Sequence, residues 1–100
     1  MFIGVGRFEL FIPASRSLKD KRQVVRAVTQ IVRNKFNVSI AEIEFQDLWQ
    51  RVAFGVACTS STPGQCSKVL QEVEKAIGRT AAGAAEIVDR SIEIGSSEDL

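Results

Sequence analysis

Hydrophobic and polar positions along the chain follow two different periods. Residues 2–12, 50–59 and 87–94 alternate between the two types, which is the period of a β-strand with one buried face. Residues 38–45 have high β-propensity, which favours a fourth strand. The pattern therefore predicts four strands, the first of which ends at Pro13.

Two other segments repeat hydrophobic residues every three or four positions, as an amphipathic α-helix does. The first begins at Ser17, which is a capping residue with an acidic residue three positions on, and Asn37 is expected to stop the helix in the left-handed region. The second begins near Pro63 and is expected to stop at Gly78. Residues 79–85 either extend this helix or form a loop, and the sequence leaves both open.

The order strand–helix–strand–strand–helix–strand predicts one α+β domain. Right-handed crossovers then give an antiparallel sheet with both helices on one face, the ferredoxin-like βαββαβ two-layer sandwich. A length of 100 residues agrees with a single domain, which we expect over residues 1–94, and we expect residues 95–100 to be a flexible tail.

Alternate side chains of each strand are expected to lie on opposite faces of this sheet. Assigned to the face toward the helices are Phe8, Leu10, Val52, Phe54, Val56, Val88 and Ile92. Assigned to the open face are Ile3, Val5, Arg7, Glu9, Phe11, Ala41, Ile43, Ala53, Gly55, Ala57 and Ile87.

An open face of this composition is unusually apolar, and exposed apolar patches usually mark an interface. Its small residues in the third strand would also let a second layer approach closely. We therefore expect a homodimer, and the candidate interface residues are Ile3, Val5, Phe11, Ile43, Ala53, Gly55 and Ala57. A monomer with a mildly apolar surface is the alternative.

Charge is distributed unevenly although the formal net charge is +1. Residues 1–36 contain eight Lys or Arg and two acidic residues, whereas residues 37–100 contain five and ten. Four cations of the first helix fall within about 60° of one another around its axis. The candidate nucleic-acid-binding residues are Arg16, Lys19, Lys21, Arg22, Arg26 and Arg33. Such cations bind phosphates with strong salt dependence, and a solvated helix face is the alternative.

Residues that commonly carry catalysis or bind metals are sparse. The chain has no His, which excludes His-based nucleophile systems and His-containing zinc sites. Cys58 and Cys66 are eight positions apart without a C-x-x-C pair, so we expect two free thiols. The loop 12–17 offers an anion site at a helix N-terminus, but no residue is evident that would activate a water. We expect a protein that is not an enzyme, with no catalytic residues, metal or cofactor.

Cellular location is constrained by two features of the chain. No apolar run approaches the ~20 residues that span a bilayer. The first residues lack the basic region and cleavage site of a signal peptide. We therefore expect a cytoplasmic protein with no membrane partner.

Three stretches, at 17–22, 36–42 and 47–51, carry a family resemblance. In sequence letters they are SLKDKR, FNVSIAE and DLWQR, and in this order they resemble signature stretches of the bacterial YlxP-like proteins, a family of small proteins of unknown function. The resemblance covers most of residues 1–94 and implies a ferredoxin-like fold. The family's genes often lie beside those of transcription and translation factors, including a ribosome-maturation factor, which implies a role near RNA or the ribosome. No catalytic residue carries over.

The resembling stretches also have structural interpretations. Trp49 is expected to pack its ring in the connection between the second and third strands along the chain, with its indole N–H hydrogen-bonded. Lys19, Lys21 and Arg22 have no evident structural role, which favours them for phosphate contact. Two hypotheses therefore stay open: a non-enzymatic RNA- or ribosome-associated factor that binds through the basic helix, or a homodimeric small-ligand-binding or protein-interaction regulatory module.

Overall fold

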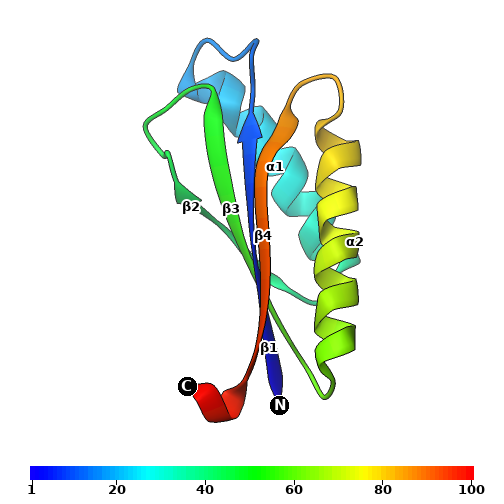
Figure 1. Cartoon of the computed structure of the whole chain (residues 1–100). Coiled ribbons are helices and arrows are strands. Elements are labelled where there is room, and N and C mark those ends of the chain that lie inside the picture. Colours follow the sequence, from blue (N-terminus) through cyan, green and yellow to red (C-terminus); the bar gives the residue numbers. More distant parts are fainter.

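The computed structural model describes all 100 residues. Its elements are β1 (Phe2–Phe11), α1 (Leu18–Lys35), β2 (Ser39–Glu44), β3 (Arg51–Ser60), α2 (Pro63–Ala81), β4 (Glu86–Ser96) and a 3-10 turn, η1 (Ser97–Asp99). The strands pair antiparallel in the order β2-β3-β1-β4. Both helices cover one face of this sheet (Figure 1). The predicted βαββαβ order and the ferredoxin-like sandwich are confirmed.

The first helix, α1, begins as its sequence predicts and ends slightly earlier. The Ser17 hydroxyl accepts a hydrogen bond from the Asp20 backbone N–H at 3.0 Å, which satisfies one of the free donors of the first turn. Phe36 is already extended, at φ −129° and ψ 145°. Asn37 is not in the left-handed region, so its expected role as the helix stop is wrong. Phe36 is the C-cap residue instead, and its side chain packs against the core.

The second helix, α2, is longer than predicted. Thr62 caps it and Pro63 is its first residue. Gly78 does not stop it, and the helix continues to Ala81. Ala81 is buried at 3% exposure, and alanine is the best helix former, so the cost of one internal glycine, about 1 kcal/mol, is offset. The turn into β4 is made by Gly83, at φ +86°. Of the segment 79–85, which the sequence leaves open, residues 79–81 therefore extend the helix and residues 82–85 form the loop.

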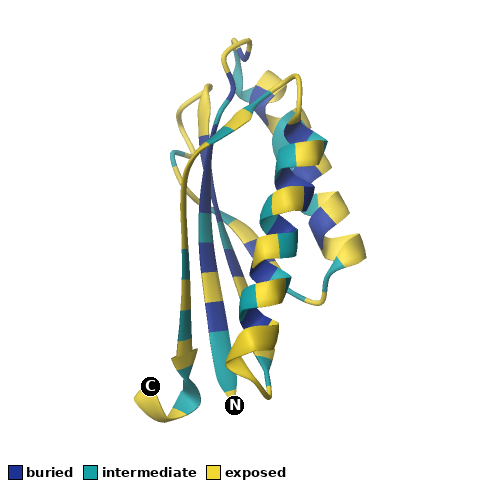
Figure 2. Ribbon diagram, turned by 45° about the vertical axis from the view of Figure 1, so that its right-hand side comes forward, coloured by how far each residue is buried: buried dark blue, intermediate teal, exposed yellow.

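The core lies between the sheet and the two helices (Figure 2). Its largest fully buried side chains are Phe8, Phe54, Leu10, Leu70, Ile77, Val28, Val32, Val52, Val73 and Cys66. Each large aliphatic or aromatic side chain buried in this way contributes about 1.5–3 kcal/mol relative to exposure. The predicted helix-facing positions of β1 and β3 are confirmed.

One strand departs from strict alternation. The register of β4 against β1 shifts: Glu9 pairs with Asp89, whereas the next residue, Leu10, pairs with Ile87. The extra residue, Val88, is 50% exposed, whereas Ile87 packs against the core. The predicted sides of Ile87 and Val88 are therefore wrong, because a β-bulge inserts one residue and inverts the alternation beyond it.

The two chain ends lie at the same end of the sheet (Figure 1). The Ser97 N–H donates to the Met1 carbonyl at 2.8 Å, and the N-terminal ammonium donates to the Ser97 hydroxyl at 3.2 Å. A capping box between Ser96 and Asp99 closes the 3-10 turn. Within segment 95–100, residues 95 and 96 therefore belong to β4, and Ser97 is hydrogen-bonded to Met1 beside the start of β1.

Candidate nucleic-acid interface

Cationic side chains form one exposed stripe along α1, which we call the basic ridge. Its residues are Arg16, Lys19, Arg22, Arg26 and Arg33, and all five are exposed. Arg26 lies about 160° around the helix from the buried Val28, so the ridge points away from the sheet. Arg33 Nη2 donates to the Ile40 carbonyl at 3.2 Å, which ties this end of the ridge to β2.

The basic ridge differs from most other cations of the chain because it has no acidic partner. The cations that form ion pairs are Arg7, Lys21, Arg51, Lys75 and Arg90. Of the remaining eight, six lie in residues 16–35, namely the ridge and Lys35. The single acid of that segment, Asp20, accepts a hydrogen bond from the Arg16 backbone N–H at 3.0 Å. The ridge is therefore a concentration of uncompensated positive charge.

Lys21 is not part of this exposed surface, and the expectation that it has no structural role is wrong. It is 2% exposed. Its Nζ donates to the Phe45 carbonyl at 2.6 Å and pairs with Glu42 Oε1 at 3.2 Å. The Gln46 carbonyl lies at 3.5 Å from the same ammonium. Lys21 therefore holds the end of β2 and the following loop against the first turns of α1.

The segment 45–50, which we call the 45–50 loop, is anchored at three points to the end of the molecule where α1 begins (Figure 1). Phe45 has φ +65°, a conformation that costs a non-glycine residue about 1–2 kcal/mol, and the Lys21 hydrogen bond fixes its carbonyl. Gln50 Nε2 donates to the Pro13 carbonyl at 2.9 Å. The Ile12 N–H donates to the Gln50 carbonyl at 2.8 Å. The loop and the start of the basic ridge are thereby held together.

Trp49 does not pack as its sequence context predicts. It is 53% exposed, and its indole N–H has no hydrogen-bond partner within the chain. It lines a cavity of about 360 Å³ together with Phe11, Asp47, Leu48, Gln50 and Arg51. Leu48 is also 46% exposed. The connection is anchored by Lys21 and Gln50, which leaves the aromatic ring free at the surface.

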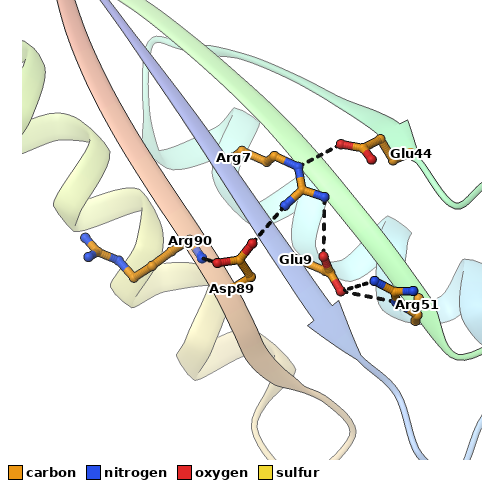
Figure 3. Close-up of polar contacts among 6 residues, drawn as sticks. All are labelled: Arg7, Glu9, Glu44, Arg51, Asp89 and Arg90. Carbon is orange, nitrogen blue, oxygen red and sulfur yellow. Dashed lines mark hydrogen bonds and ion pairs between the residues drawn. The ribbon is translucent and has the colours of Figure 1, made fainter.

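The open face of the sheet carries an ion-pair cluster of five side chains (Figure 3). Arg7 Nε donates to Glu44 Oε1 at 2.7 Å, Nη1 to Asp89 Oδ2 at 3.3 Å, and Nη2 to Glu9 Oε1 at 3.3 Å. The other Glu9 oxygen accepts from Arg51 Nη2 at 2.6 Å. The hydrogen bond from Arg51 holds the pKa of Glu9 below its usual value, and the one from Arg7 adds to this. The hydrogen bond to Glu44 raises the pKa of Arg7.

Sequence reasoning missed this cluster. The only local signal was the pair Arg7 and Glu9, which alternation places on the same face. Glu44 joins it because the register of β2 shifts between Glu42 and Glu44, so that Glu42 faces the helix side and Glu44 the open side. A bulge of this kind has no unambiguous mark in a single sequence.

The seven residues predicted to form a dimer interface differ in accessibility. Val5, Ile43 and Ala57 are exposed, Ile3, Phe11 and Gly55 are half-buried, and Ala53 is fully buried. Ile43 Cγ2 would lie 2.9 Å from a Cβ placed on Gly55, so the chain's own side chain already covers this glycine. Ile43 therefore covers part of Gly55, although Gly55 and Ala57 still line a hollow on this face. The exposed apolar part of the face centres on Val5 and Ile43.

Other chemistry on the chain is limited. Cys58 and Cys66 are free and buried, and burial raises the pKa of the Cys58 thiol. No cluster of three or more His, Cys, Asp or Glu side chains is arranged to hold a metal ion. Neither helix combines the length and the apolar character needed to cross a bilayer.

Several solved structures share this fold at low sequence identity. SnoaB, a cofactor-independent oxygenase from Streptomyces nogalater, superposes with a TM-score of 0.60 at 3% identity, covering 97% of this chain and 94% of that one. A de novo designed protein with a ferredoxin fold gives 0.53 at 17% identity over 97% and 90%. A chlorite dismutase candidate gives 0.63 at 9% identity over 99% of this chain, which spans 45% of that longer one. Identities this low establish the fold alone.

Sequence relatives are more specific. The uncharacterized protein YlxP of Bacillus subtilis (strain 168) is 44% identical over 88 residues, covering 78% of this chain and 96% of that protein. The family model described as "Protein of unknown function (DUF503)" matches residues 3–92. The resemblance to YlxP-like proteins is confirmed, and this chain belongs to the DUF503 family of proteins of unknown function.

Proposed function

We propose that this protein is a non-enzymatic RNA-binding factor that contacts RNA phosphates through the basic ridge. The observation that carries the proposal is the ridge itself, four exposed cations on the outer side of α1 and Arg16 just before the helix, with no acidic partner. Other surface cations, such as Arg90 and Lys75, are paired with a carboxylate. A polyanion is the natural partner of an uncompensated cationic stripe.

The dimensions and residue types of the ridge suit a phosphate backbone. Lys19 and Arg33, the first and last ridge residues within α1, are about 21 Å apart along the helix axis at 1.5 Å per residue, which is long enough to reach several phosphates. Four of the five ridge residues are arginines, whose planar guanidinium groups bind phosphate oxygens in a bidentate manner. Structured RNA, including that of ribosomal particles, is the partner we propose.

The test compares two triple variants of equal net charge. The ridge variant combines Lys19→Gln, Arg22→Gln and Arg26→Gln. The control combines Lys35→Gln, Lys68→Gln and Arg79→Gln, which are also exposed and without an ion pair. Affinity for an RNA hairpin is measured by anisotropy of the labelled RNA at several salt concentrations. Co-sedimentation of both variants with ribosomal particles is the second readout.

The slope of log affinity against log salt counts the phosphate contacts, at about 0.7–0.9 per contact. We expect the ridge variant to lose about 2 to 3 units of this slope, with weaker binding at every salt concentration, and the control to match the wild type. Equal losses in the two variants would mean that only net charge matters and would refute the ridge as the site. Absence of RNA binding by the wild type would refute the proposed function.

The second candidate function, a homodimeric module assembled through the open sheet face, is favoured by one observation. Val5 and Ile43 are 44% and 45% exposed and border a hollow of about 370 Å³ on that face. Light scattering at tens of micromolar tests it. Val5→Lys should convert a dimer to a monomer, whereas Ile31→Lys, at an exposed apolar residue of α1 in the helix layer, should not. A wild-type monomer would refute the dimer.

A further inference from the structure

The cavity beside Trp49 remains unassigned after the ridge and the ion-pair cluster are accounted for. We propose that it holds one unpaired base of the bound RNA, stacked on the Trp49 ring. The inference rests on the proposed RNA binding through the basic ridge and adds a second type of contact to it. Its occupant is a nucleobase that belongs to the same RNA whose phosphates contact the ridge.

The lining of the cavity has the composition of a nucleobase site. Trp49 and Phe11 supply aromatic surface, and Leu48 adds an exposed aliphatic side chain. Asp47 and Gln50 also line the cavity and carry acceptor oxygens, for which the N–H groups on a base edge are complementary donors. A largely apolar cavity of about 360 Å³ with a few polar groups is large enough for one base and typical of small-molecule sites.

The exposure of Trp49 is the feature that a purely structural role leaves unexplained. The 45–50 loop is held in place without it, by Lys21 at one end and Gln50 at the other. Leu48 and Trp49, consecutive in the loop, are 46% and 53% exposed, and contiguous exposed apolar surface usually marks a binding site. Bases of single-stranded or looped RNA are bound in proteins mainly by stacking on such rings.

The cavity and the start of the basic ridge are connected through Gln50, which lines the cavity. Gln50 Nε2 donates to the Ser15 carbonyl at 3.3 Å, and Ser15 directly precedes Arg16. Gln46 and Arg22 line a common hollow of about 300 Å³. A nucleotide whose phosphate contacts Arg16 would therefore have the Gln50 side of the cavity within reach of its base. The uncompensated positive charge of the neighbouring ridge favours RNA over an uncharged apolar ligand.

The backbone of the loop is also fixed before any ligand binds. Phe45, which opens the loop, has φ +65°, and its ring lies under the Arg51 guanidinium at 3.9 Å from the ring centroid. Arg51 in turn donates to Glu9. Such preorganisation lowers the entropic cost of binding. It also connects the wall of the cavity to the ion-pair cluster on the open face.

Trp49 provides the probe, because the chain has one Trp and no Tyr. The full-length protein is titrated with an RNA hairpin that has an unpaired loop, with a fully paired duplex containing the same number of phosphates, and with mononucleotides. Trp49 emission is recorded for the wild type. Labelled-RNA anisotropy then gives the affinities of Trp49→Ala and Trp49→Phe. Circular dichroism and urea unfolding confirm that both variants remain folded.

We expect the hairpin to quench Trp49 emission more strongly than the duplex does. Trp49→Ala should weaken hairpin binding by roughly 5- to 150-fold, the range expected for one stacked base, and leave duplex binding unchanged. Trp49→Phe should retain most of the hairpin affinity.

Three outcomes would overturn the inference. If Trp49→Ala binds the hairpin normally while the ridge variant does not, the cavity is not a base site and the proposed function survives. If mononucleotides quench as strongly as the hairpin and the ridge variant binds them equally well, the site takes free nucleotides instead. If Trp49 emission changes with protein concentration in the absence of RNA, the occupant is a second copy of the chain.

Discussion

Lys21 is the residue whose replacement tests most directly how the 45–50 loop is held. Lys21→Met keeps an unbranched side chain of similar length and removes the ammonium. The Phe45 carbonyl then loses a donor at 2.6 Å, and Glu42 loses its partner at 3.2 Å. Because the Lys21 side chain is only 3% exposed, water does not readily replace it.

The expected magnitude follows from these contacts. A hydrogen bond from a charged donor contributes about 1.5–3 kcal/mol, and breaking a buried ion pair costs about 3–5 kcal/mol. Glu42 retains 22% side-chain exposure, which places the expected value below the upper limit. We expect Lys21→Met to lower the free energy of unfolding by about 2–3 kcal/mol. For a domain of this size, this corresponds to a fall in Tm of roughly 8–24 °C.

Urea unfolding followed by circular dichroism measures this loss, and Lys19→Met is the matched control. Lys19 is exposed and unpaired on the same helix turn, so its replacement should change stability by less than about 0.5 kcal/mol. Glu42→Gln and the double variant complete a cycle that isolates the pair. A loss below about 0.5 kcal/mol for Lys21→Met would refute the assignment of Lys21 as the anchor of the loop.

Two further predictions concern the sheet. The pKa of Glu9 is lowered in the folded state, chiefly by Arg51, so its stabilising contribution is present above the unfolded pKa of about 4.3 and is lost as pH falls through the folded value. Urea unfolding between about pH 6 and about pH 3 should therefore show a steeper loss for the wild type than for Glu9→Gln, and equal slopes would contradict the pairing. Gly4→Ala should destabilise by about 1–3 kcal/mol, because its Cβ would lie 2.9 Å from Leu70 Cδ1. Gly95→Ala, which meets no atom within 4 Å, is its control and should be nearly neutral in the same assay.

The periodicity of the chain was enough to predict the order of elements and most of the core. Alternation placed Phe8 and Phe54 on the helix side because a side chain on a regular strand has only two choices of face. The Ser17 cap was equally visible, since its hydrogen bond to Asp20 joins residues three apart in the chain. Local rules succeeded where the interaction itself is local.

The same rules failed where a partner distant in sequence decided the outcome. Lys21 looked like the neighbouring cations of its helix, and only its meeting with Phe45, 24 positions away, revealed it as an anchor. Val88 and Ile87 lie on the faces opposite to those predicted, because β4 pairs with β1 through a bulge. The sequence predicted that Trp49 packs within its loop, whereas hydrogen bonds from Lys21 and Gln50 hold the loop and leave Trp49 exposed.

The sequence by itself determined the secondary structure, the two-layer fold and the concentration of cations in α1, because hydrophobic period and residue type are properties of short segments. Tertiary structure alone decided which cations have no ion-pair partner, since Lys21 forms an ion pair with Glu42 while Lys19 and Arg22 pair with no carboxylate. It also decided that Gln50, which lines the Trp49 cavity, is hydrogen-bonded to the residue before Arg16. The physical reason is that ion pairs, register shifts and cavities depend on three-dimensional distances between segments, which the periodicity of one segment does not encode.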